Sequence, residues 1–159
     1  MEFEFIRIDD RLIHGQVALG WSRAKGIGGI AAVDDETAQN SFRCSLLKMA
    51  TPPGVKSVIL TQKSFKDAYD KNKFSKRKYM LLVKNVFTLL DLVKMGIPIK
   101  KVNIGNSRNP NGEKVLEFVY LSQEEKEAYK ELAQYGISFY AQSLPDQQSY
   151  DFDKIIQTF

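Results

Sequence analysis

The side chains that could carry chemistry are concentrated in one short segment near the start of the sequence, Arg7 to Val17. It contains two arginines, the carboxylates Asp9 and Asp10, and His14, the one histidine of the chain. The simplest alternative is that the charges are solvated and that His14 makes only a local hydrogen bond. A purely structural turn rarely needs all of these groups, so the segment is the leading candidate for a reactive site.

An anion-binding position is expected beside His14 if a helix begins there. The free backbone N–H groups of Gly15, Gln16 and Val17 then lie at the positive end of the helix dipole. Gly15 has no side chain to keep a phosphate away from the backbone. Arg11 can add a charge-assisted contact worth roughly 1.5–3 kcal/mol. These residues together predict phosphate binding next to the imidazole.

Nucleophilic attack on phosphorus is the chemistry that fits a lone imidazole in this setting. One ring nitrogen attacks while the other is held by a carboxylate or a carbonyl, and either Asp9 or Asp10 could hold it. The sequence therefore predicts a phosphohistidine at His14, with Arg11 and Asp10 as the other catalytic residues. Transfer between nitrogens requires in-line positioning and stabilisation of spread negative charge, so no cofactor is expected.

Other chemistries lack the residues that they need. A phosphatase with an Arg-His-Gly motif requires a second histidine, and Ile13 precedes His14 here. Residues 105–109 lack the second glycine of a serine-hydrolase elbow, and residues 26–29 precede a strand where a dinucleotide motif would follow one. The single cysteine, Cys44, excludes an internal disulfide, and without a Cys/His cluster no metal site is expected.

Apolar periodicity predicts the elements that must position this segment. Strands are expected at 2–8, 29–33, 58–60, 79–83, 101–104, 115–120 and 137–141. Helices are expected at 14–25, 36–49, 64–71, 85–95 and 122–135, with a short helical tail at 153–158. The signals at helix ends are Ser64 as an N-cap, the Ser122–Glu125 capping box, and the stops Gly26, Gly96 and Gly136.

Alternating strands and helices predict an α/β fold, a doubly wound, mainly parallel sheet with helices on both faces. Ligands in such folds bind beyond the carboxyl ends of the strands, and His14 lies in the first loop of that kind. Asp34 and Asn103 end other strands and could support the site together with Arg7 and Asp9, although a turn or cap role is equally open.

Several apolar side chains are expected to face the core. On the second helix these are Phe42, Leu46, Leu47 and Met49, with Cys44 buried beside them; on the fourth they are Phe87, Leu90, Val93 and Met95.

Composition places the chain among single-domain globular proteins, with one domain spanning residues 1–159. The sequence has no membrane-length apolar run and no apolar leader, which predicts an intracellular, reduced protein. The net charge of +4 weakly favours an acidic partner. A basic cluster leaves nucleic-acid binding open against a solvated loop; it comprises Lys71, Lys73, Lys76, Arg77 and Lys78.

The segment from Arg7 to Val17 resembles the active-site signature of the IIB component of the mannose/fructose/sorbose class of the bacterial phosphoenolpyruvate-dependent sugar phosphotransferase system. Trp21 follows at the position typical of that family. Further resemblance covers essentially the whole chain, at Val33–Glu36, Thr51–Val55, Met80–Val83, Val102–Gly105, Glu131–Leu132 and Gly136–Ile137. One departure is Asn106-Ser107, where many relatives have a glycine and a hydrophobic residue.

The resemblance implies a cytoplasmic protein-N(pi)-phosphohistidine–sugar phosphotransferase at the inner face of the cell membrane. A phosphohistidine of a IIA partner passes its phosphoryl group to His14, which passes it to a sugar held by the membrane IIC and IID components. Arg11 matches the arginine that steadies the phosphorylated imidazole. The alternatives are a non-catalytic domain that senses phosphate and a nucleic-acid-binding domain, and a homo-oligomer is not excluded.

Overall fold

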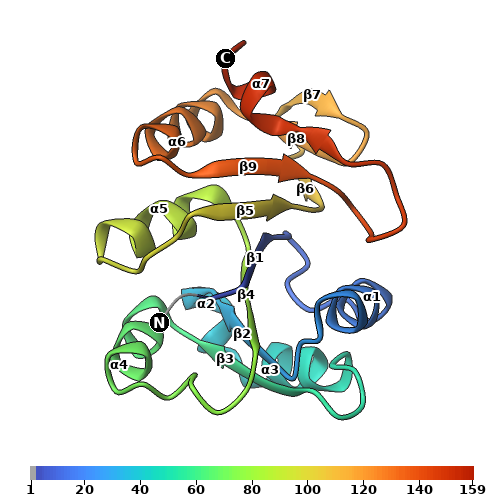
Figure 1. Ribbon diagram of the computed structural model, residues 1–159, viewed down its shortest axis with the longest axis vertical. Helices are drawn as coiled ribbons and strands as arrows, with labels where there is room; N and C mark the ends of the chain where they lie inside the picture. The colour runs from blue at the N-terminus through green and yellow to red at the C-terminus, as the bar shows by residue number, and fades with distance from the viewer. Residues whose placement is uncertain (1–2) are drawn as a thin grey trace.

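A seven-stranded sheet forms the centre of the computed structural model, which describes residues 3–159 (Figure 1). Its strand order is β10-β9-β5-β1-β4-β2-β3, and every neighbouring pair is parallel except β10 with β9. The strands are β1 (Phe5–Ile8), β2 (Gly29–Val33), β3 (Lys56–Leu60), β4 (Tyr79–Val83), β5 (Lys101–Ile104), β9 (Ser138–Ala141) and β10 (Tyr150–Asp151). The predicted α/β, mainly parallel architecture is confirmed.

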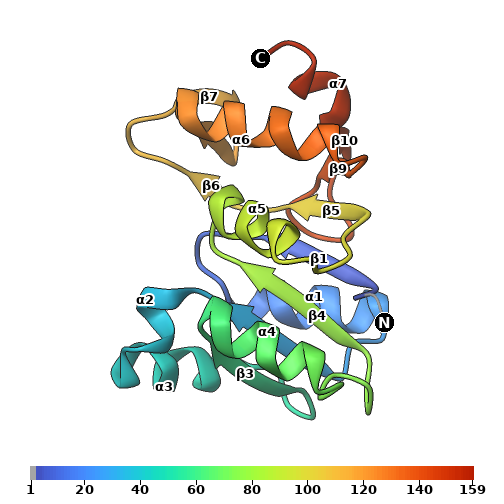
Figure 2. The same cartoon turned by 90° about the vertical axis from the view of Figure 1, so that its left-hand side faces the viewer.

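Helices cover both faces of the sheet. The connections between parallel strands are right-handed, and they run toward both ends of the strand order, so the connecting helices fall on opposite faces. On one face lie α1 (Gly15–Lys25) and α3 (Ser41–Met49). On the other lie α4 (Gln62–Asp70), α5 (Val86–Lys94) and α6 (Gln123–Gln134) (Figures 1 and 2). The short helices α2 (Asp35–Ala38) and α7 (Phe152–Ile156) complete the set within the described residues.

Two apolar cores result, one on each face of the sheet. Phe5, Trp21 and Met80 belong to the core beneath α1, while Phe65, Leu89 and Leu132 belong to the larger core beneath α4, α5 and α6. The middle strands contribute to both because alternate side chains of a strand point to opposite faces. This explains why β2 and most of β4 are apolar without interruption.

The helix expected at 36–49 is in fact two helices, and this prediction was wrong. Gln39 caps the end of α2, and Asn40 begins α3, where its side-chain oxygen accepts a hydrogen bond from the Arg43 amide. A capping residue inside an apolar repeat offers the backbone an alternative to helix, and here it prevails. The predicted N-cap Ser64 is also wrong: Thr61 caps α4, and Ser64 is the N3 residue of its capping box.

The strand expected at 115–120 is likewise two strands. It divides between β7 (Glu113–Leu116) and β8 (Val119–Leu121), which pair antiparallel with an irregularity between Lys114 and Leu116. With β6 (Ser107–Arg108) they form a separate three-stranded sheet, and β6 lies in a segment where neither a strand nor a helix was expected. The first strand begins at Phe5, and Glu2, its expected start, lies outside the described residues.

Several residues expected in the core are instead exposed. Phe42, Leu46 and Met49 have relative exposures of 71%, 49% and 82%, and α3 has no buried residue. Phe87 and Met95 of α5 are 42% and 39% exposed. Cys44, expected to be buried, is half-buried. Helical spacing indicated a shared face correctly, but it does not show whether a neighbouring element covers that face.

None of the helices in residues 3–159 is both long enough and apolar enough to cross a membrane.

Candidate functional site

The site is built where the carboxyl ends of three adjacent parallel strands meet. β1 lies between β4 and β5, and the loops that follow these strands are joined to it by backbone hydrogen bonds. The Asp9 amide donates to the Val83 carbonyl at 3.0 Å, and the Gly105 amide donates to the Ile8 carbonyl at 2.8 Å. His14 lies in the loop that follows β1 and is exposed, so a reacting group can reach it.

The backbone of that loop is held in an unusual conformation at Leu12. Its φ of 57° lies in the left-handed region, which is costly for a bulky side chain. The Leu12 side chain is buried, and its amide donates to the Asp9 carbonyl at 2.9 Å. The resulting sharp turn leaves both Arg11 and His14 at the surface.

A buried carboxylate holds two guanidinium groups at the base of the loop. Asp9 is fully buried, and its Oδ2 accepts from Nη2 of Arg7 and Nη2 of Arg11, both at 3.1 Å. Its Oδ1 accepts from the amide and Nε of Arg11, at 3.0 and 3.1 Å. The contact with Arg11 is therefore bidentate and fixes the plane of that guanidinium.

Arg7 anchors this group in the protein interior. Its Nη1 donates to the Asn103 side-chain oxygen and, at 2.9 Å, to the Gln142 carbonyl, while its Nη2 donates to the Ser143 carbonyl at 3.0 Å. Burial lowers the pKa of Arg7, and the neighbouring Asp9 opposes that shift. A fully buried arginine with a carboxylate and carbonyls around it acts as a fixed support.

Arg11 is the exposed end of the same group. Its side chain is 37% exposed, and hydrogen bonding to Asp9 raises its pKa, so it stays charged throughout the physiological range. Its remaining terminal nitrogen, Nη1, makes no hydrogen bond to any residue from 3 to 159. Arg11 thus presents one oriented, unengaged N–H edge to solvent beside His14.

The N-terminus of α1 is also unengaged, and this distinguishes it from the other described helices. α2 to α7 each begin with an Asp, Asn, Thr or Ser whose side chain accepts an amide hydrogen bond. α1 begins with His14, which makes no side-chain cap, and its first turn has no acidic residue. The predicted phosphate-binding amides of Gly15, Gln16 and Val17 therefore have no side-chain acceptor there.

The expected carboxylate partner of His14 is not found in this structure. The His14 ring makes no hydrogen bond within the described chain. Asp9 is engaged with the arginines, and Asp10, expected to be catalytic, accepts from the Asn106 side chain at 2.7 Å and the Arg108 amide at 2.8 Å. Asp10 is thus a positioning residue for the loop after β5, and Asn106, the departure from the family pattern, is its partner.

Asn103 and Asp34, the two strand-end residues expected to support the site, lie in different surroundings. Asn103 lies opposite Arg7 on neighbouring β5, and its side-chain oxygen accepts a hydrogen bond from Arg7. Asp34 follows β2, which β4 separates from β1. Its Oδ2 accepts from the amide and hydroxyl of Thr37, at 3.1 and 2.6 Å, so the cap role is the one observed.

A cavity of about 170 Å³ adjoins the site. Asp10, Arg11 and Leu12 line it on one side, and Thr37, Arg43, Leu46, Leu47 and Lys84 complete its wall. Its cationic side chains make it suited to an anion. Sequence reasoning did not single out Lys84, or the Gln142 and Ser143 carbonyls that hold Arg7. Lys84 and Gln142 directly follow parallel strands, so the rule that placed His14 could have found them.

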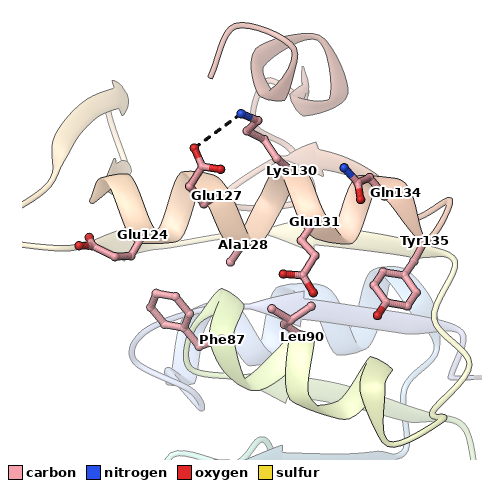
Figure 3. Close-up of a pocket in the computed structure, with 9 residues that line it drawn as sticks. All are labelled: Phe87, Leu90, Glu124, Glu127, Ala128, Lys130, Glu131, Gln134 and Tyr135. Carbon is pink, nitrogen blue, oxygen red and sulfur yellow. Dashed lines mark ion pairs between the residues drawn. The ribbon is translucent and has the colours of Figure 1, made fainter.

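A groove with a volume of about 960 Å³ lies elsewhere, between α5 and α6 (Figure 3). Glu124, Glu127 and Glu131 line it together with Phe87 and Tyr135. None of the residues predicted for the site lies in it. Its three carboxylates outnumber its one lysine, Lys130, so this groove is less suited to a phosphoryl group than the cavity beside Arg11.

Two remaining expectations concern surface groups. The basic cluster from Lys71 to Lys78 precedes β4, so it lies near the amino ends of the parallel strands, whereas His14 lies beyond their carboxyl ends. Lys78 of this cluster forms an ion pair with Glu4 at 2.7 Å. In residues 3–159, no three His, Cys, Asp or Glu side chains are grouped closely enough to hold a metal ion.

Comparisons with known proteins point to one family. The family model "PTS system sorbose subfamily IIB component" matches residues 3–159. The sorbose-specific EIIB component of Lacticaseibacillus casei is 37% identical over 82% of this chain and 80% of its own length. The mannose-specific EIIAB component of Escherichia coli (strain K12) is 36% identical over 82% of this chain, which matches 41% of that longer protein. The crystal structure of the IIBSor domain of the Klebsiella pneumoniae sorbose permease superimposes with a TM-score of 0.91 at 28% identity, covering 100% of this chain and 99% of that one.

Proposed function

Because this chain belongs to the sorbose subfamily of PTS IIB components, a family of phosphotransferases that carry phosphate from IIA to a sugar, we propose that His14 is the residue that carries the phosphoryl group. One observation supports this assignment above the others. The exposed imidazole begins a helix whose first-turn amides lack a side-chain acceptor, beside an arginine whose free edge is fixed by a buried carboxylate.

The proposed step exchanges one P–N bond for another. A ring nitrogen of neutral His14 attacks the phosphorus of the donor's phosphohistidine, and the donor's P–N bond breaks as its electron pair returns to the donor nitrogen. The two imidazoles exchange roles, so atoms, charge and protons balance without a further reactant. Onward transfer to a sugar hydroxyl repeats the step with oxygen as the acceptor, and the hydroxyl proton is released.

Each supporting group has a distinct role in this proposal. Nη1 of Arg11 and the amides of Gly15, Gln16 and Val17 stabilise the charge that spreads over the phosphoryl oxygens in the transition state. Asp9 positions Arg11, and Arg7 with Asn103 positions Asp9. Asp10 holds the loop that contains Asn106 and Arg108. The phosphoryl group must also leave, and an exposed site with one free arginine edge suits a transient carrier.

A IIB component works with IIA and with IIC/IID partners, and we assign the individual encounters from that. The phosphodonor is the IIA protein or domain, and the acceptor is a sugar held by the membrane components IIC and IID. These contacts would hold the protein at the inner face of the cell membrane.

The test is to label the purified chain with radioactive phosphoenolpyruvate, the general phosphotransferase proteins and a matching IIA. The expected label is acid-labile and base-stable, as a phosphohistidine requires, and is absent from His14→Gln. Arg11→Lys keeps the charge but loses the bidentate contact with Asp9, so the rate of labelling should fall roughly 100-fold while the final amount of label is retained.

Label that remains in His14→Gln would overturn the assignment. Phosphate binding without any label in the parent chain would favour the regulatory alternative, a domain that senses phosphate and does not transfer it. Circular dichroism of each variant checks that the fold is intact, which the exposure of His14 and Arg11 leads us to expect.

A further inference from the structure

The outer face of α3 is apolar and uncovered by any part of residues 3–159. Phe42, Leu46 and Met49 are spaced i, i+4 and i+7, so they share one face of the helix. They are 71%, 49% and 82% exposed, and they account for half of the large apolar side chains that the described chain exposes. Apolar surface concentrated on one short helix is typical of an interaction site.

This face is continuous with the phosphoryl-acceptor site. The C-terminal end of α3 adjoins the start of α1, since a Cβ built on Gly15 would lie 3.8 Å from the Ala50 carbonyl oxygen. Farther along the helix, Leu46 lines the cavity that Arg11 also lines. α1 and α3 lie on the same side of the sheet (Figure 1). A partner that reaches His14 from this side therefore covers the α3 face as well.

The charges around the cavity indicate what kind of partner this is. Arg11, Arg43 and Lys84 line it, against one carboxylate, Asp10, that is already bonded to Asn106 and Arg108. Arg43 has an exposed ion pair with Glu36 at 3.4 Å, which contributes little. Before phosphorylation the site is therefore cationic, and it complements a partner that arrives with a phosphoryl group.

We propose that the face formed by Phe42, Leu46 and Met49 is the docking surface for the phosphodonor, a IIA protein whose phosphohistidine is surrounded by an apolar rim. This rests on the function proposed above. Charge favours the donor over the membrane partner that holds the sugar. This chain is already phosphorylated when it meets the membrane partner, so the phosphoryl group has by then neutralised the cationic site. The groove between α5 and α6, the other apolar surface, is lined by three carboxylates and one lysine, Lys130, so its net negative charge disfavours a phosphorylated partner (Figure 3).

The experiment measures single-turnover transfer from phosphorylated IIA to the full chain at increasing IIA concentration. Phe42→Ser combined with Met49→Ser should raise the half-saturating concentration roughly tenfold or more, the loss expected for central contact residues, and leave the saturated rate nearly unchanged. The control is Phe87→Ser with Tyr135→Ser, which removes two other exposed large side chains, 42% and 53% exposed, from the α5–α6 groove and should leave both parameters unchanged.

A second phosphoryl source separates docking from chemistry. Phosphoramidate is small and needs no protein docking, so it should label His14 equally in the parent chain and in the α3 variant. An unchanged half-saturating concentration of IIA in the α3 variant overturns the docking proposal alone, whereas failure of phosphorylated IIA to label His14 in the parent overturns the proposed function.

A second copy of this chain or a membrane component could cover the α3 face instead, and the measurements distinguish each of these from IIA. If the parent chain sediments as a dimer and the α3 variant as a monomer with normal transfer from IIA, a second copy covers the face and the proposal is wrong. Normal transfer from IIA with slower transfer to sugar in membrane vesicles would overturn it in favour of the membrane components.

Discussion

A single carboxylate, Asp9, organises the charged residues at the start of the chain. It neutralises one of the two guanidinium charges, that of buried Arg7, and orients the other on exposed Arg11. The net positive charge therefore appears where an anion can reach it. Breaking a buried ion pair by removing one partner costs about 3–5 kcal/mol, so the buried pair with Arg7 holds Asp9 firmly where it orients Arg11.

Sequence reasoning singled out His14 and Arg11 as candidates because they belong to a dense local pattern. It could not distinguish Asp9 from Asp10, since both are adjacent carboxylates and only the direction of the turn at Leu12 separates their surroundings. Asp9 faces the buried Arg7, and Asp10 faces the loop after β5. That difference depends on residues roughly a hundred positions away in sequence, which a local pattern does not contain.

Gly15→Ala tests whether the glycine is needed for phosphate to approach the backbone amides or for the stability of the fold. A Cβ there would meet nothing closer than the Ala50 carbonyl oxygen at 3.8 Å, an ordinary contact. We expect the free energy of unfolding to be unchanged or raised by roughly 0.4–1 kcal/mol. Phosphoryl transfer to His14 should fall roughly 10- to 100-fold, because the methyl group displaces the phosphate from the amides.

Gly20→Ala is the matched control, a second glycine of α1 whose Cβ would lie 3.5 Å from Pro145. It should keep the parent transfer rate. Thermal unfolding and single-turnover labelling measure the two effects separately, and full activity in Gly15→Ala would show that the glycine is not needed for phosphate approach.

At the scale of elements, the sequence predicts the strands of the parallel sheet better than it predicts the β7–β8 hairpin or the exposure of α3. The strands at 29–33, 79–83 and 101–104 are confirmed, because each is short, mostly buried on both faces and bounded by turn signals. The hairpin of β7 and β8 was taken for one strand because its turn contains no Gly, Pro or Asn signal. Exposure of Phe42 and Met49 was missed because apolar periodicity is the same for a core face and for a docking face.

Gly105→Ala should damage the support for the site through the loop after β5. A Cβ there would lie 2.1 Å from Nη2 and 2.3 Å from Cζ of Arg7, so the guanidinium must move and lose contacts with Asp9 or the carbonyls. We expect a loss of about 1–3 kcal/mol in the free energy of unfolding. Transfer to His14 should also slow, because Asp9 no longer holds Arg11 correctly.

Gly28→Ala provides the comparison for that experiment. Its Cβ would make an ordinary contact at 3.7 Å with Arg77, at the other edge of the sheet. Denaturant unfolding should show little change for Gly28→Ala. Equal stability of the two variants would mean that Arg7 can move without cost, contrary to the support role assigned to it.

At the scale of the whole molecule, the two faces of the sheet have different roles. The face with α4, α5 and α6 holds the larger core, and α6, β9 and α7 meet there around Tyr129, whose ring packs against Phe139 and Phe152. The face with α1 and α3 holds the smaller core and the reactive loop. Stability and reactivity can therefore be varied on separate faces.

Tyr129→Phe should stabilise the molecule without changing transfer. Its hydroxyl is buried and has no hydrogen-bond partner within residues 3–159, and burial raises its pKa, so it stays neutral and unsatisfied. Removing it should raise the free energy of unfolding by roughly 1 kcal/mol in a denaturant titration. Tyr135→Phe, at an exposed position, should have no effect, and a loss of stability in Tyr129→Phe would reveal a hidden partner such as a buried water.

The bonds from Arg7 to the Gln142 and Ser143 carbonyls join groups 135 and 136 residues apart. A ribosome therefore releases the loop that contains Arg7 well before it releases the two carbonyls that anchor Arg7. Until Gln142 and Ser143 have emerged, the nascent loop lacks these acceptors. A chain cut before residue 142 would therefore leave Arg7, and through Asp9 also Arg11, without part of its support.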